Sequence, residues 1–238
     1  MRWFASSAPL RATSRPMPRA RIAAVAVLVL LTAFVAVDLV AMALYPGGTW
    51  MDRGTVGHRF WANFLCDLGH AVSLDGRPNP AAAPGRAALW LLVLSAGAFW
   101  LTVPALFRTP GWARFVRASG TVSTVAMVLL PFASGRTHLL VVLSGALPGL
   151  AAAFATLWAL RHRTGLAALG RLAVALALVD VVLYVRYFDA TILAVPLIQR
   201  VALLAGVTWM AACAVAVLRQ EAVAAAGSAS VSGSPRAT

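Results

Sequence analysis

Lysine is absent from this sequence, and only seven side chains are Asp or Glu. Charged residues of all kinds make up 11% of the chain, whereas a soluble domain carries roughly a quarter. Hydrophobic residues make up 61%, and so much apolar surface cannot be buried inside one globule of this size. The composition therefore excludes an ordinary soluble protein and predicts an integral membrane protein.

Cysteine and histidine are also scarce, which limits redox and metal chemistry. Cys66 falls in an expected loop and Cys213 lies deep in the last apolar run, so we predict no disulfide between them. The sequence has no CxxC motif, and no histidine lies well inside an apolar run where it would ligate haem. We therefore expect no cofactor.

The twenty basic residues are all arginines and give a formal net charge of +13. They flank apolar runs instead of forming a stripe with interleaved aromatic residues, so we expect no nucleic-acid partner. We interpret them as topology signals and as contacts for anionic lipid head groups. The arginine-only, alanine-rich usage is typical of a GC-rich bacterial genome.

Six apolar segments predict the transmembrane part, at residues 21–44, 87–107, 118–133, 139–160, 172–188 and 192–218. Each is close to the roughly 20 residues that a helix needs to cross a bilayer, and spans in lipid must be helical to pair their backbone groups. We predict an all-α, polytopic six-transmembrane-helix bundle over residues 21–219, with disordered tails at 1–20 and 220–238. The first segment resembles a signal peptide, but its length and Asp38 favour a retained span.

The arginines also predict an orientation in the cell membrane. With both termini in the cytoplasm, thirteen arginines lie inside and seven outside, while six of the seven acids fall in the outer half. The positive-inside rule favours this arrangement. The expected partners are membrane lipids, with anionic head groups at the cytoplasmic face.

The loop between the first two spans predicts an outer amphipathic helix over residues 58–70. One face carries polar side chains, and the neighbouring face is rich in aromatic residues. The polar face consists of Arg59, Asn63, Cys66, Asp67 and His70. It either faces a ligand site above the bundle or simply meets water.

Three charged residues lie inside the predicted spans at a similar depth in the outer leaflet: Asp38, Asp180 and Arg200. A charge within a span costs at least ~2.5 kcal/mol, so it normally pairs or lines a wet cavity. We expect Arg200 to pair with Asp180 or with Asp38. The pair either fixes helix register or forms part of a ligand site.

Further polar residues are expected to ring the outer mouth of the bundle, where Arg136 and His138 follow the third span and Arg186 and Asp189 follow the fifth. A ring of arginines suits an anionic head group or another small anion. The complete predicted ligand site is Arg59, Asn63, Asp67, His70, Arg136, His138, Asp180, Arg186 and Arg200. Gly145 and Gly149, like Ser119 and Ser123, form small-xxx-small pairs that let helices approach closely.

The run NFLCDLG at residues 63–69, followed by DGRPNPAAAPGRAALW at 75–90, resembles a known pattern. It is similar to the bacterial six-helix membrane proteins of domain-of-unknown-function family 998, which resemble eukaryotic DRAM-like proteins. The resemblance implies a six-helix bundle and no assigned activity, and Cys66 stands where a small residue is more usual. The matching positions are Asn63, Asp67, Leu68, Gly69, Asn79, Pro80, Gln199, Arg200 and Trp209.

Three functions remain open from the sequence. The preferred one is a non-enzymatic protein that binds a lipid head group or a small polar ligand at an outward-facing vestibule. The second is a membrane-embedded metal-dependent hydrolase with His58, His70, His138 and Asp67 as ligands, although the sequence has no HxxH-like or HxxxH pair on one helix. The third is a small-solute transporter, for which we find no midplane site or inverted repeat.

Overall fold

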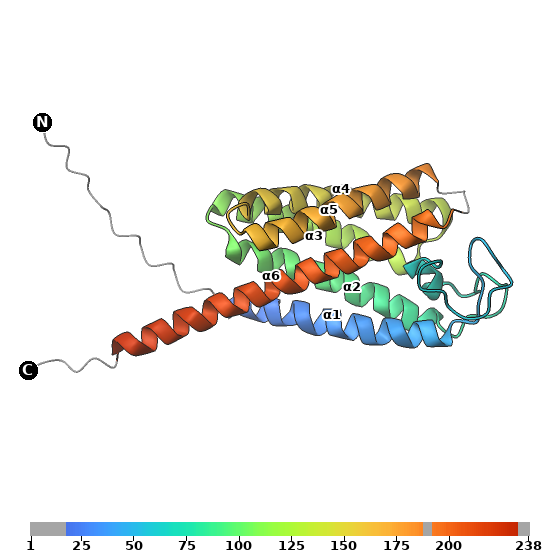
Figure 1. Cartoon of the computed structure of the whole chain (residues 1–238), viewed down its shortest axis with the longest axis horizontal. Coiled ribbons are helices and arrows are strands. Elements are labelled where there is room, and N and C mark those ends of the chain that lie inside the picture. The colour runs from blue at the N-terminus through green and yellow to red at the C-terminus, as the bar shows by residue number, and fades with distance from the viewer. Residues whose placement is uncertain (1–17, 188–191, 233–238) are drawn as a thin grey trace, which may run out of the picture.

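The computed structural model describes residues 18–187 and 192–232 of the chain (Figure 1). In this part of the chain, six helices are long and apolar enough to cross a membrane. They are α1 (Pro18–Leu44), α2 (Ala82–Thr102), α3 (Pro110–Met127), α4 (Gly135–Ala159), α5 (Thr164–Arg186) and α6 (Ala194–Ser232). The predicted six-helix membrane bundle is confirmed.

Several helices extend beyond the apolar segments that predicted them. Short 3₁₀ turns prolong α2 and follow α3, namely η2 (Val103–Leu106) and η3 (Leu130–Phe132). Helix α6 continues to Ser232, past residue 220, where we expected a disordered tail to begin. The alanine-rich run at residues 222–226 has high helix propensity, which accounts for the extension. Of the N-terminal tail expected at 1–20, residues 1–17 lie outside the described part.

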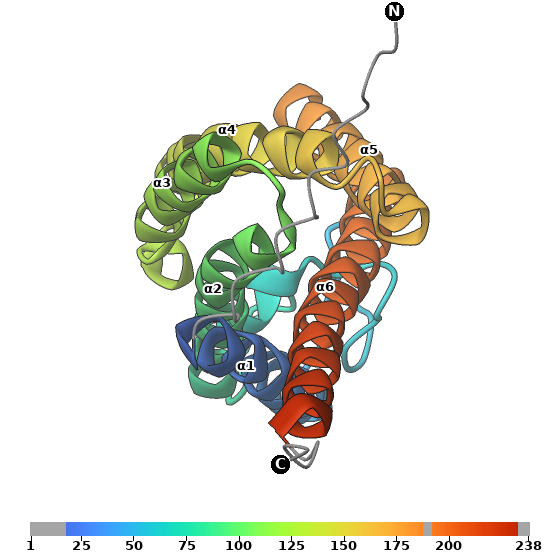
Figure 2. The same cartoon turned by 90° about the vertical axis from the view of Figure 1, so that its left-hand side faces the viewer.

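The helices pack as neighbours along the chain, α1 with α2, α3 with α4, and α5 with α6. Viewed along the bundle, α3, α4 and α5 form an arc that faces α1, α2 and α6 (Figure 2). A core of buried side chains, including Val27, Phe99, Trp100 and Trp209, lies between these two groups. Surfaces that face outward remain apolar, as expected for helices whose solvent is lipid.

The small residues of α3 and α4 pack against one another within the chain. Ser123 Oγ donates to the Gly145 carbonyl at 2.7 Å, and Ser119 Oγ donates to the Pro148 carbonyl at 2.7 Å. A Cβ atom on Gly145 would come within 2.5 Å of Met127 Cγ, so the helices approach too closely there for a larger residue. The predicted close approach is therefore an intramolecular contact between α3 and α4.

The loop at residues 45–81 covers one end of the bundle, which we name the outer end after the predicted orientation, without forming the predicted amphipathic helix (Figure 1). Residues 59–63 make a turn, and only Leu65–Gly69 is helical, as the short 3₁₀ helix η1. The prediction of one continuous helix over 58–70 is wrong because Asn63 and Asp67 bind nearby backbone groups in place of the helical pattern. As a consequence, both side chains point into the protein.

Candidate functional site at the outer end of the bundle

The interior of the loop is organised around the buried carboxylate of Asp67. Its Oδ1 accepts a hydrogen bond from Trp50 Nε1 at 3.0 Å, and its Oδ2 accepts from the backbone N–H of Phe64 at 2.9 Å and from Asn63 Nδ2 at 3.3 Å. Asn63, which is fully buried, also donates to the Gly48 carbonyl and accepts from the Arg59 N–H. Both side chains are therefore used to hold the loop together.

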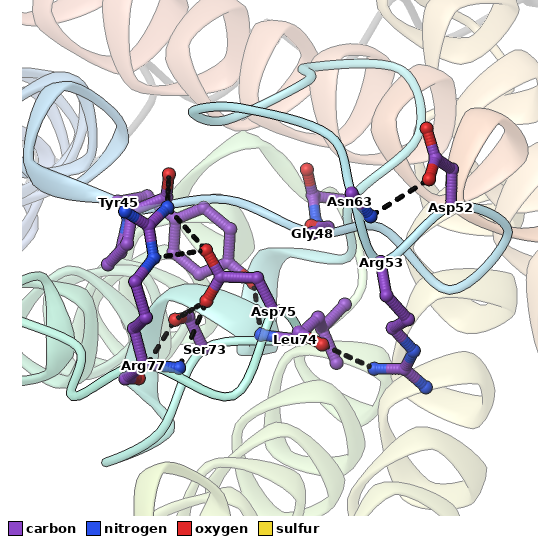
Figure 3. Close-up of polar contacts among 11 residues, drawn as sticks. Tyr45, Gly48, Asp52, Arg53, Asn63, Ser73, Leu74, Asp75 and Arg77 are labelled. Carbon is purple, nitrogen blue, oxygen red and sulfur yellow. Dashed lines mark hydrogen bonds and ion pairs between the residues drawn. The ribbon is translucent and has the colours of Figure 1, made fainter.

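The outer edge of the loop is held by a second set of polar contacts (Figure 3). Asp75 accepts from Ser73 Oγ and from Arg77 Nε, and these bonds lower the pKa of Asp75 to about 2. Tyr45, at the end of α1, accepts from the Leu74 N–H through its hydroxyl. Burial of this hydroxyl raises the pKa of Tyr45 to about 12. These groups tie the loop to α1.

Further contacts hold the loop against the start of α2. Asn79 Nδ2 donates to the carbonyls of Leu68 and His70, and Arg86 Nε donates to the Gly69 carbonyl at 2.8 Å. Gly85 touches the same segment, since a Cβ there would lie 2.5 Å from the Leu68 carbonyl carbon. The backbone of η1 thus rests directly on the first turns of α2.

Helix α6 holds the loop through Gln199 and Arg200. Gln199 Oε1 accepts from the Leu65 N–H at 2.9 Å. Arg200 is 0% exposed, and its Nη1 lies 3.7 Å from Asp38 Oδ2 on α1. Of the two partners predicted for Arg200, the structure confirms Asp38.

The other faces of the Arg200 guanidinium contact the loop. Its Nε donates to the Asn63 carbonyl at 3.3 Å, and its Nη2 lies 3.2 Å from His58 Nε2. The ring of Phe60 stacks beneath it, with 4.9 Å from the guanidinium carbon to the ring centroid. One buried cation therefore joins α1, α6 and the loop.

Burial and the Arg200 charge shift the pKa values of the neighbouring groups. Loss of solvent, together with the adjacent cation, lowers the pKa of His58 to about 4, so its ring is neutral at physiological pH. The neutral ring accepts the Arg200 N–H through Nε2, and a metal ion on that nitrogen would face the guanidinium. Burial raises the pKa of Asp67, although its three hydrogen-bond donors oppose the rise. Burial likewise raises the pKa of the Cys66 thiol.

A second group of side chains faces the loop from α4 and α5. Cys66 in η1 lies close enough to Arg200 and Asp180 for both charges to influence its thiol. The ring of Tyr184, one turn above Asp180, contacts both Phe64 of the loop and His138 of α4, each with ring centroids 6.2 Å apart. We call Asp38, Cys66, Asp180 and Arg200 the outer polar cluster.

The outer polar cluster contains buried polar atoms that lack hydrogen-bond partners among the described residues. These atoms are Asp38 Oδ1, Asp180 Oδ1 and Arg200 Nη1. Native proteins leave few such atoms, and each one calls for an explanation such as a water molecule or a bound ligand. The outer polar cluster is therefore the part of the outer end where buried polar atoms still need hydrogen-bond partners.

The predicted site residues divide into three groups. Asn63, Asp67 and Arg200 are buried and hold the loop, while His138 is buried and Asp180 half-buried beneath it. His70 is half-buried and close enough to Asp67 to influence its pKa. The remaining three, Arg59, Arg136 and Arg186, are exposed, and Asp189 lies outside the described residues.

Sequence reasoning missed the roles of Trp50, Phe60 and His58 in this arrangement. His58 stood out only as a possible metal ligand. Their partners are distant in sequence, since His58 and Arg200 are 142 residues apart. No local spacing signals such a contact.

Within the described residues, no group of three or more His, Cys, Asp or Glu side chains is placed to hold a metal ion. Comparison of the chain with protein-family models, with curated proteins and with solved structures finds no match.

Proposed function

We propose that this integral membrane protein binds a phospholipid head group at its outer end, above the outer polar cluster, without catalysing a reaction. The observation that carries the proposal is the set of three buried polar atoms without hydrogen-bond partners among the described residues. A ligand that offers both a hydrogen-bond donor and an acceptor there would complete their bonding. The Asp180 carboxyl oxygen requires the donor, and Arg200 Nη1 requires the acceptor.

Exposed arginines above the cluster support a phosphate-containing ligand. Arg136 lies in the first turn of α4 and Arg186 in the last turn of α5, at the same end of the bundle as the loop (Figure 1). Arg186 is six residues above Asp180, which is about 9 Å along the helix. A phosphate at the arginines and a donor group nearer Asp180 match the extended shape of a head group.

The resemblance to family 998 coincides with the residues that hold the loop around this site. Its matching positions include Asn63, Asp67, Asn79, Gln199 and Arg200, and each of these side chains makes a contact that seats the loop on the helices. We therefore propose that the chain belongs to that group. In this interpretation the matching residues hold the loop over the site, and the exposed arginines determine which ligand binds.

Native mass spectrometry of the full chain released from its own membrane tests the proposal. We expect a phospholipid adduct on the wild-type protein and on the control Asp52→Asn, because Asp52 is an exposed loop residue. Asp180→Leu should lose most of the adduct. Replacing Arg136 and Arg186 together by Gln removes about 1 kcal/mol of attraction per arginine, or roughly thirty-fold in affinity.

Two outcomes would contradict the proposal. One is a wild-type protein that carries no phospholipid, or one whose adduct is the same in all variants. The other is stoichiometric zinc in the same spectra, which would favour the metal-dependent hydrolase.

A further inference from the structure

A separate apolar cavity of about 250 Å³, which is partly open to the surface of the bundle, lies between α2 and α6 on one side and α3, α4 and α5 on the other. Its walls are almost entirely apolar and include the indole rings of Trp100 and Trp209. Gly206 of α6 faces this space, since a Cβ there would meet no atom within 4 Å. Helix α1 contributes no residue to the lining.

The lining residues of the cavity follow three helices over a similar length. Its lining extends from Gly145 to Ala153 on α4, from Ala173 to Val181 on α5, and from Ala202 to Met210 on α6. Each stretch covers eight residue steps, which correspond to about 12 Å. A dry cavity of roughly 150 Å³ is already large enough to bind benzene, so this one takes an apolar group of about ten carbons.

The outer end of the cavity adjoins the outer polar cluster. Asp180 shares a helix face with Ala173 and Ala177, which both line the cavity, and it lies one turn above Ala177. On α6, Arg200 precedes the lining residue Ala202 by two positions. The apolar space thus ends beneath a buried carboxyl oxygen that lacks a hydrogen-bond donor among the described residues.

We infer that the ligand is a lysophospholipid whose single acyl chain occupies this cavity. The inference rests on the proposed head-group site and specifies its ligand. The volume accommodates about ten carbons of one acyl chain and leaves no room for a second chain. The free glycerol hydroxyl, which a diacyl phospholipid lacks, donates to Asp180 Oδ1, and the phosphate extends toward Arg136 and Arg186.

Tryptophan fluorescence tests the position of the chain. Trp100 and Trp209 are buried in the cavity wall, whereas Trp90, Trp112 and Trp158 are exposed at the surface. The full chain is reconstituted in phosphatidylcholine vesicles and titrated with lysophosphatidylcholine that is brominated in its chain. We expect saturable quenching that is lost when Trp100 and Trp209 are both replaced by Phe.

Substitutions that fill the cavity test the chain site, and a substitution outside the cavity is their matched control. A Cβ at Gly206 meets no atom within 4 Å, and neither does a Cβ at Gly165, which lies outside the cavity. Gly206→Leu should weaken the saturable quenching at least ten-fold, and Gly165→Leu should leave it unchanged. Ala146→Leu, on α4, fills the cavity from the opposite wall and should repeat the effect of Gly206→Leu.

The inference is overturned if no saturable quenching occurs, or if both filling variants retain it. It is also overturned if brominated diacyl phosphatidylcholine quenches the two buried tryptophans equally well. Saturable quenching that survives in Asp180→Leu would support the chain site and contradict the head-group site. A phospholipid adduct without saturable quenching would support the head-group site and contradict the chain site.

Discussion

His58 lies between a permanent cation and an aromatic ring, and this position determines its protonation. Arg200 Nη2 is 3.2 Å from its Nε2, and the ring of Tyr45 meets it edge-on at 5.9 Å between centroids. Protonation would place a second positive charge beside the guanidinium in a site that excludes most water. The pKa of His58 therefore falls from 6.5 to about 4.

This shift predicts a loss of stability in mild acid. The unfolded chain takes up the His58 proton near pH 6.5, whereas the folded chain resists it down to about pH 4. Stability from the neutral ring is therefore complete above pH 6.5 and declines as the pH falls toward 4. After allowance for the exposed part of the ring, the decline is on the order of 2 kcal/mol.

Thermal unfolding in detergent at a series of pH values measures this effect in the wild type and in His58→Gln, whose amide oxygen still accepts from Arg200. The buried Asp67 has a raised pKa, which changes stability in the opposite direction, so the difference between the two proteins isolates His58. We expect the wild type to lose stability relative to the variant between pH 6.5 and 4. Parallel profiles for the two proteins would refute this assignment.

At the residue scale, depth along the helices identified the right charges, but it could not choose between partners. Asp38 and Asp180 were equally good candidates for Arg200, because sequence gives the depth of a residue but not the angle between helices. The structure pairs Arg200 with Asp38. The roles of Asn63 and Asp67 depended on backbone groups within the loop, which no periodic pattern reveals.

Among the elements, the contact between η1 and α2 depends on a glycine. A Cβ at Gly85 would lie 2.5 Å from both the carbonyl carbon and the carbonyl oxygen of Leu68 and 2.8 Å from the Gly69 nitrogen. These are backbone atoms, which cannot rotate away as a side chain can. The loop therefore reaches its position only because residue 85 has no side chain.

Gly85→Ala should accordingly destabilise the protein by about 1–3 kcal/mol through overpacking. Gly165→Ala is the matched control, because its Cβ would meet no atom within 4 Å and alanine is the better helix former. We expect a lower midpoint of thermal unfolding for Gly85→Ala, together with faster proteolysis within residues 45–81. The control should unfold no earlier than the wild type, and equal behaviour of the two variants would disprove the close contact.

The six spans were predictable because bilayer thickness fixes the length of an apolar helix. The loop was not predictable, because its residues show helical spacing while their side chains satisfy backbone groups instead. The cavity could not be predicted from the sequence either. Its glycines are ordinary in a membrane helix, and only the assembled bundle shows that Gly145 is covered by Met127 while Gly206 faces open space.

In the whole molecule, the two ends differ in charge. The end opposite the loop carries arginines from the α2–α3 and α4–α5 connections, from the adjoining turns of α3 and α5, and from α6. They are Arg108, Arg114, Arg117, Arg161, Arg163, Arg171 and Arg219. Its one described acid, Glu221, lies 3.9 Å from Arg21. The loop end holds the acids Asp52, Asp67 and Asp75. The positive-inside rule therefore favours the loop on the non-cytoplasmic side.

Cysteine labelling in intact cells tests the orientation with the full chain. In a background carrying Cys66→Ala and Cys213→Ala, one cysteine is introduced at Ala71, exposed in the loop, or at His162, exposed in the α4–α5 connection. A membrane-impermeant maleimide should label Ala71→Cys in intact cells and His162→Cys only after permeabilisation. The reverse pattern would place the outer polar cluster at the cytoplasmic face. The ligand would then have to come from the inner leaflet, and the outward-facing placement of the site would have to be abandoned.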